Sequence, residues 1–249
     1  MARLEEIVAW CDALLTPEKY RDYCPNGLQV EGEKEVSLII SGVTASQALI
    51  DVAIDLSADA LLVHHGFFWK NDDPRVVGMH RKRLRALLEH DVSLLAYHLP
   101  LDAHPQLGNN ARLAAQFGWI SEASLNAEGI GNVGRLERAM KADEFAALLT
   151  AKLGREPIWV AGGPEWIERI AWCTGAAQGY IEQAVSFGVD AYISGEISEP
   201  TTHVARECGL HYFAAGHHAT ERYGVQALAE QLENTFAVRH RFIDIFNPA

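Results

Sequence analysis

Residues 38–65 read LIISGVTASQALIDVAIDLSADALLVHH. The apolar run over 38–43 predicts a strand, the apolar spacing from 46 to 56 predicts a helix, and the run over 60–63 predicts a second strand. A helix over 79–89 and a strand over 92–97 extend this order to βαβαβ. Strands that alternate with helices pair in parallel through right-handed crossovers, so the pattern predicts an α/β protein with a parallel sheet.

The same order occurs again between residues 170 and 215. Strands are expected over 170–174, 191–194 and 210–215, and helices over 178–187 and 201–207. Asp59-Ala60 opens the middle strand of the first set and Asp190-Ala191 that of the second, which indicates an internal duplication. We therefore expect two similar βαβαβ lobes of three-layer α/β/α character.

The lobes are expected over residues 1–125 and 126–249. Residues 121–134 are rich in small and polar side chains and are predicted to form the linker between them. The last segment, 238–245, alternates in polarity and is predicted to be a further strand that packs on the first lobe.

Composition narrows the class of protein. A chain of 249 residues, 49% hydrophobic and 22% charged, lies in the ordinary globular range. The formal net charge of -12 repels a phosphate backbone, so direct nucleic-acid binding is not expected. Neither an apolar run of membrane-spanning length nor a signal peptide is evident, and the four scattered cysteines fit reduced thiols, so we expect a cytoplasmic protein.

Histidines and carboxylates gather where three predicted strands end. His64 and His65 close the run over 60–63, residues 98–104 follow the strand over 92–97, and residues 216–221 follow the strand over 210–215. A histidine and a carboxylate four residues apart occur at equivalent places, as His98 with Asp102 and as His217 with Glu221. Since the carboxyl ends of parallel strands share one crevice, these side chains are expected to face it.

This pattern predicts metal binding. Helix positions four apart are neighbours, so His217 and Glu221 can bind one ion while His218 points elsewhere. His64 and His65 would point to opposite faces of a strand, but a bend at Gly66 would let them serve two ions.

Nitrogen and oxygen ligands suit zinc, manganese or iron rather than calcium, and five ligands are too many for one tetrahedral zinc. We therefore expect two divalent metal ions, with a bridging carboxylate, on His64, His65, Asp102, His217 and Glu221. His98 and His104 are candidates for a supporting, substrate-facing or proton-transfer role.

Four segments carry a family resemblance: VHHGFFWK (63–70), YHLPLDAHPQLGNN (97–110), ISGEIS (193–198) and AAGHHATERYG (214–224). They resemble the Nif-three-like proteins, also labelled GTP cyclohydrolase 1 type 2 homologues, and are close to the YbgI-like enterobacterial members. The resemblance implies that the two lobes are interlinked, with a dinuclear metal centre between them, and that the chain forms a toroidal homohexamer. It also implies the five ligands chosen above.

Two functions are compatible with these features. The first is a metal-dependent hydrolase that uses a metal-bound water on a small molecule, either nucleotide-like or a cyclic amide. The alternative is a non-enzymatic, metal-binding hexameric platform or adaptor in stress or damage responses. The glycine-rich loops that bind nucleotides in Rossmann and P-loop proteins are absent from the sequence.

Overall fold

The computed structural model describes all 249 residues and divides into two compact units. The first comprises Met1–Leu107 and Gly224–Phe246, and the second comprises Gly108–Tyr223 and Asn247–Ala249. The chain thus changes unit at Leu107 and Tyr223, whereas the sequence expectation had a single boundary between residues 125 and 126. No helix of the chain is both long enough and apolar enough to cross a bilayer.

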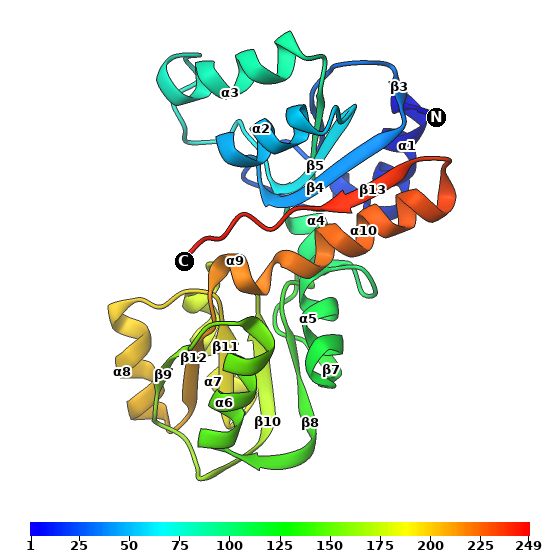
Figure 1. Cartoon of the computed structure of the whole chain (residues 1–249). Coiled ribbons are helices and arrows are strands. Elements are labelled where there is room, and N and C mark those ends of the chain that lie inside the picture. The colour runs from blue at the N-terminus through cyan, green and yellow to red at the C-terminus, as the bar shows by residue number, and fades with distance from the viewer. The chain divides into compact units, whose positions relative to one another are not determined.

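The first unit is built on a five-stranded sheet of order β13-β4-β5-β6-β2. The order β4 (Leu38–Thr44), α2 (Gln47–Asp55), β5 (Ala60–His65), α3 (Gly78–Glu89), β6 (Ser93–Ala96) confirms the predicted βαβαβ segment. These strands pair in parallel, and β2 (Gly27–Val30) adds an antiparallel edge beside β6. Strand β13 (Arg239–Phe242) runs parallel to β4 and forms the other edge of the sheet (Figure 1). A segment near the end of the chain thus belongs to the unit in which the chain begins.

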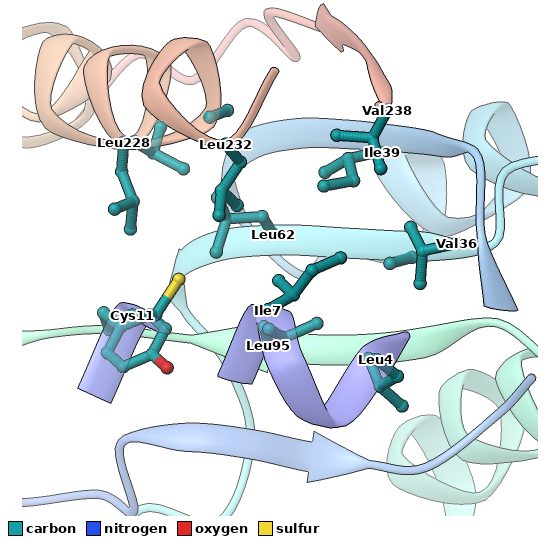
Figure 2. Packing of buried hydrophobic residues seen from close by; sticks show 14 of the residues in the cluster. Leu4, Ile7, Cys11, Val36, Ile39, Leu62, Leu95, Leu228, Leu232 and Val238 are labelled. Carbon is teal, nitrogen blue, oxygen red and sulfur yellow. The ribbon is translucent and has the colours of Figure 1, made fainter. Parts of the chain in front are cut away.

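The apolar core of this unit has two layers, one on each face of the sheet, because successive strand residues point to opposite faces. Ile39, Leu62 and Leu95 face helices α1 (Leu4–Leu15) and α10 (Arg222–Thr235), as Figure 2 shows. Their neighbours Ile40 and Leu61 face α2 and α3 instead. Because successive strand residues point to opposite faces, the near-continuous apolar runs of the sequence are what a sheet covered on both sides requires.

Short elements complete the first unit. Strands β1 (Ala2–Arg3) and β3 (Glu35–Val36) form an antiparallel pair, and a 3-10 turn, η1, spans Pro17–Lys19. Helix α4 (Leu99–Ala103) follows β6 after two residues. Its position directly after a parallel strand brings residues 98–102 to the carboxyl end of the sheet.

The second unit is built on a six-stranded sheet of order β7-β8-β10-β11-β12-β9. Its parallel centre is β10 (Trp166–Cys173), β11 (Ala191–Ser194) and β12 (His211–Ala214), with β9 (Ile158–Val160) antiparallel at one edge. The predicted linker over 121–134 is wrong, because β7 (Ile120–Ser124) and β8 (Asn132–Lys141) form an antiparallel hairpin there. Its small and polar residues belong to the exposed edge strand β7, to the turn, and to the first residues of β8, which lies between β7 and β10.

Helices of the second unit follow the predicted order. Between the parallel strands lie η2 (Gln178–Tyr180) with α7 (Ile181–Ser186), and then α8 (Glu199–Cys208). Helices α5 (Asn109–Phe117) and α6 (Ala142–Leu153) pack with Trp172, Ile193 and Phe213 of the sheet in one apolar cluster. The short helix α9 (His217–Thr220) follows β12, as α4 follows β6.

Two equivalent aspartates, directly before β5 in the first unit and β11 in the second, accept hydrogen bonds from the backbone of the preceding strand. The Asp59 carboxylate accepts hydrogen bonds from the backbone amides of Ser37 and Leu38, at 2.7 and 2.9 Å. The Asp190 carboxylate accepts from Glu168 and Arg169 in the same way, at 2.9 and 2.8 Å. The repeated sequence pattern therefore corresponds to a repeated structural device, as expected of two related βαβαβ segments.

Candidate metal centre

Three histidines of the first unit cluster at the carboxyl ends of neighbouring strands. His64 and His65 end β5, and His98 precedes α4. Their ring centroids lie 4.6 Å (His64 to His65), 5.1 Å (His64 to His98) and 5.7 Å (His65 to His98) apart. One nitrogen of each lies within 4.8 Å of the others, so the three form a group able to hold a metal ion.

Asp102 adds a carboxylate to this group. Its Oδ1 lies 3.5 Å from His64 Nε2, and the two side chains are 8% and 0% exposed, respectively. Burial of a carboxylate is costly unless a cation or hydrogen bonds compensate for it. A buried carboxylate beside clustered imidazoles is therefore the ligand chemistry expected of a transition-metal site.

Each histidine is oriented through Nδ1. His64 Nδ1 donates to the Tyr97 carbonyl at 2.8 Å, and since a carbonyl only accepts, this bond assigns the proton to Nδ1 and the lone pair to Nε2. His98 Nδ1 lies 2.7 Å from an Asp22 oxygen, and His65 Nδ1 lies 3.1 Å from the hydroxyl oxygen of a threonine at the end of β4. Such a second contact is how proteins fix the tautomer and direction of metal-ligating histidines.

Asp22 is a supporting residue that the sequence did not reveal. Its carboxylate accepts from the Leu99 amide, 2.9 Å away, and from the Asn26 side chain, also at 2.9 Å, as well as pairing with His98. Burial raises the pKa of Asp22, but the His98 contact and the other hydrogen bonds outweigh it and lower the pKa to about 2. Asp22 and His98 lie far apart in the chain, so no local pattern could have paired them.

Gly66 leaves space for a neighbouring side chain. His64 and His65 both belong to β5, and Gly66 has no positive φ. A Cβ at Gly66 would lie 2.2 Å from Gln29 Oε1, which accepts from the Phe67 amide at 2.7 Å. Glycine is therefore needed at this position because the Gln29 amide lies against the backbone here.

In the second unit, His217 and Glu221 form the predicted pair. His217 begins α9, Glu221 follows it, and His217 Nε2 lies 3.0 Å from a Glu221 oxygen. The other ring nitrogen, Nδ1, lies 2.7 Å from Glu196 Oε1, a contact that no spacing in the sequence predicts. Burial lowers the pKa of His217, but Glu221 and Glu196 outweigh burial and raise it to about 9.

Gly175 packs directly against this pair. It follows β10 with φ +70°, and a Cβ there would lie 2.1 Å from Glu221 Oε1 and 3.3 Å from His217 Nε2. Its amide donates to the Thr220 hydroxyl at 3.2 Å, and its carbonyl accepts from the Gly195 amide at 2.9 Å. The ends of β10, β11 and β12 are thereby drawn together around the carboxylate.

His104 has a local role in the first unit. It ends α4, and its Nδ1 accepts from the amides of Gln106 and Leu107 at 3.2 and 3.1 Å. Burial lowers the pKa of His104, in agreement with a neutral ring that accepts these bonds. Of the two extra histidine candidates, the structure therefore brings His98 into the cluster and uses His104 to hold the following turn.

The residues present fit a divalent metal by the chemistry of their donors. The first unit offers imidazole nitrogens and a buried carboxylate, and the second offers one imidazole with a carboxylate that is 3% exposed. Such a mixed nitrogen and oxygen set suits zinc, manganese or iron. The four cysteines are all free thiols, and three of them are buried.

Comparison with known proteins places the chain among relatives. The model of the family described as Duf34/NIF3 (NGG1p interacting factor 3) matches residues 2–248. A Pseudomonas aeruginosa protein named GTP cyclohydrolase 1 type 2 homolog is 55% identical over 249 residues, covering 99% of this chain and 98% of that protein. The protein of the same name from Escherichia coli K12 is 53% identical, with 92% of each chain covered.

Solved structures show the same similarity. Protein ybgI, described as of unknown function, is 49% identical, with a TM-score of 0.97 and 100% of both chains covered. TTHA1606 from Thermus thermophilus is 33% identical, with a TM-score of 0.91 and the same full coverage of both chains. The mixed α/β fold is therefore shared along the whole chain.

Proposed function

The chain belongs to the DUF34/NIF3 family, and from that premise we propose that it is a metal-dependent hydrolase with a dinuclear centre. The proposed ligands are those that the sequence predicted: His64, His65, Asp102, His217 and Glu221. The observation that carries the proposal is the orientation of the histidines, because His64, His65 and His217 each have Nδ1 held by an oxygen atom. This leaves Nε2 as the atom suited to bind a metal.

Two divalent ions on these residues would supply Lewis-acid polarisation of the substrate and a water of lowered pKa. The protein supplies the rest. Asp102 and Glu221 contribute negative charge in buried surroundings, where it offsets the charge of the cations most effectively. His98, held by Asp22, lies beside His64 and is the residue that would give or take a proton at Nε2.

The substrate class follows from the family. The curated relatives carry the name GTP cyclohydrolase 1 type 2 homolog, which points to hydrolysis within the ring of a purine nucleotide. We propose a nucleotide-like or cyclic amide substrate, since both present a carbonyl or amidine carbon to an activated water. The net charge of -12 gives no support for a nucleic-acid substrate.

Elemental analysis combined with an activity screen tests the proposal. Protein purified without added metal should contain two zinc, manganese or iron ions per chain, and the screen should cover nucleotides, cyclic amides and phosphoesters. His64→Ala and Glu221→Ala should each lose both metal and turnover. His203→Ala is the matched control, because it removes a histidine that pairs with Glu199 four residues away at 2.7 Å but on an exposed surface.

The outcomes separate the two functions. Undiminished hydrolysis by a metal-free variant rules out the proposed mechanism. Two tightly held ions without turnover on any substrate favour the alternative, a non-enzymatic metal-binding platform. A structural site should also have all its coordination positions filled by protein, whereas a catalytic site keeps positions for water.

Assembly is a separate proposal. On the family resemblance we propose a ring-shaped homohexamer, which light scattering coupled to size-exclusion chromatography tests directly. The measured mass should be six times the 27.5 kDa of the chain. A monomer at micromolar concentration contradicts it.

A further inference from the structure

An indole ring lies beside the histidine cluster of the first unit. The ring centroid of Trp69 is 5.1 Å from that of His98, with the two planes at 89°, and 5.9 Å from that of His65. Trp69 is half-buried, in contrast to Trp172, which is fully buried in the core of the second unit. Trp69 therefore lies against the histidine cluster, beside the candidate ligand His65 and the supporting His98, while part of its surface stays open.

The backbone holds Trp69 in this place at a conformational cost. Phe68, directly before it, has φ +64°, a left-handed conformation that costs a residue with a side chain. Lys70, directly after it, donates its amide to the Tyr23 carbonyl at 2.7 Å. The segment is thus fixed on both sides of Trp69, and this pre-organisation favours a defined role for the ring.

The two residues whose backbones fix the segment are themselves aromatic. Phe68 is 41% exposed, and Tyr23, whose carbonyl anchors the segment, is 60% exposed. Trp69 itself, half-buried beside the histidine cluster, offers a flat surface on which a planar ring can stack. Stacking needs no particular hydrogen-bond pattern from the ring, because every heteroaromatic base has a π face.

We propose that Trp69 binds the substrate by stacking on a planar heteroaromatic ring, such as a purine, next to the histidine cluster. This inference rests on the proposed function and narrows its substrate class to a molecule with a flat base rather than a simple aliphatic amide. His98 contacts Trp69 nearly perpendicularly and thereby fixes the tilt of the indole. The stacked ring would then lie within reach of the group proposed to transfer a proton.

Binding measurements with two probes test the inference. Metal-loaded protein is titrated by equilibrium dialysis with guanosine 5′-monophosphate and with ribose 5-phosphate, which lacks the base. Trp69→Ala should weaken guanosine 5′-monophosphate binding by roughly 5- to 150-fold, the equivalent of ~1–3 kcal/mol per stacked base. Trp69→Phe should retain most of the affinity, and binding of ribose 5-phosphate should be the same in all proteins.

Trp166→Ala is the matched control, since Trp166 is 51% exposed in the second unit and packs against Lys141. It should leave binding of both probes unchanged. Metal content, measured on every variant, should equal that of the wild type, which separates loss of stacking from damage to the metal ligands.

Three results would overturn the inference. One is equal affinity of Trp69→Ala and the wild type for guanosine 5′-monophosphate, and another is a parallel loss of affinity for both probes in Trp69→Ala. The third is a wild-type protein that shows no preference for the probe with a base. Failure of the hydrolase proposal appears separately, as absent metal or absent turnover.

Discussion

Replacement of Gly175 by alanine probes the candidate site through its backbone. The new Cβ would lie 2.1 Å from Glu221 Oε1, whereas real Cβ contacts are essentially never below 3.0 Å. The carboxylate must therefore move by about 1 Å, a displacement large enough to disturb a metal site. Glu221 has little room to move, because it is 3% exposed and lies 3.0 Å from His217 Nε2.

Two separable effects are expected from Gly175→Ala. The left-handed φ of +70° should cost roughly 1–2 kcal/mol of folding stability for a residue with a Cβ. Displacement of Glu221 should weaken metal binding about 10- to 100-fold, as changes that disturb ligand orientation commonly do. The stability loss should persist in chelator, whereas the affinity loss is visible only with metal.

Gly209→Ala isolates the backbone effect. Gly209 ends α8 with φ +72°, and a Cβ there would meet nothing within 4 Å. In urea titrations with chelator present, Gly175→Ala should therefore lose at least as much stability as Gly209→Ala, since it adds the contact with Glu221 to the same backbone cost. Competition with a chelating indicator should show weakened metal binding for Gly175→Ala alone. Wild-type metal affinity in Gly175→Ala would refute the placement of Glu221 among the ligands.

Three other predictions concern the chain away from the site. Burial lowers the pKa of His240, which lies 2.7 Å from the Ser41 hydroxyl, so the folded state resists protonation and the free energy of unfolding should fall as the pH drops below the usual pKa of 6.5. In pH-dependent urea titrations, His240→Gln should reduce this loss of stability at acidic pH. An unchanged loss would contradict the prediction. Iodoacetamide at pH 8 should label one thiol of the native protein, Cys208, which is exposed, and Cys208→Ser should abolish labelling. The other three cysteines are buried, and burial raises the pKa of Cys11 and of Cys24 to about 12. Mass spectrometry would count the adducts, and a second adduct on the native protein would contradict the prediction. Leu232→Ala should lower the free energy of unfolding in urea by ~2–5 kcal/mol, because the Leu232 side chain is fully buried between α10 and the sheet. The control Leu88→Ala, at a side chain that is 58% exposed, should change it by less than about 0.5 kcal/mol. Equal effects of the two substitutions would show the burial argument to be wrong.

The spacing of apolar residues along the sequence was enough to predict the central strands of both sheets. The bounds predicted from the apolar runs differ by at most four residues from those of β4, β5 and β6, and of β10, β11 and β12. The pairing of His217 with Glu221 was also readable, because positions four apart meet in a helical turn. These features depend on contacts between chain neighbours, which sequence spacing encodes directly.

Other features depended on how distant segments pack. The hairpin of β7 and β8 was mistaken for a linker, because its first strand, β7, is an exposed edge strand, which needs few apolar residues and so lacks a clear pattern. The boundary at Leu107 was likewise missed, since no change in composition marks it. The positions of edge strands and unit boundaries depend on which distant segments pack against them, and the periodicity of the sequence carries no information on that packing.

The sequence by itself determined the types of residue available for metal binding and the strand ends that carry them. Only the tertiary structure decided which groups orient them, such as Asp22 for His98 and Glu196 for His217, and where glycine is required for space, as at Gly66 and Gly175. The physical reason is that strand and helix periods come from local backbone geometry. A hydrogen bond between segments far apart in the chain exists only once the sheet has brought them together.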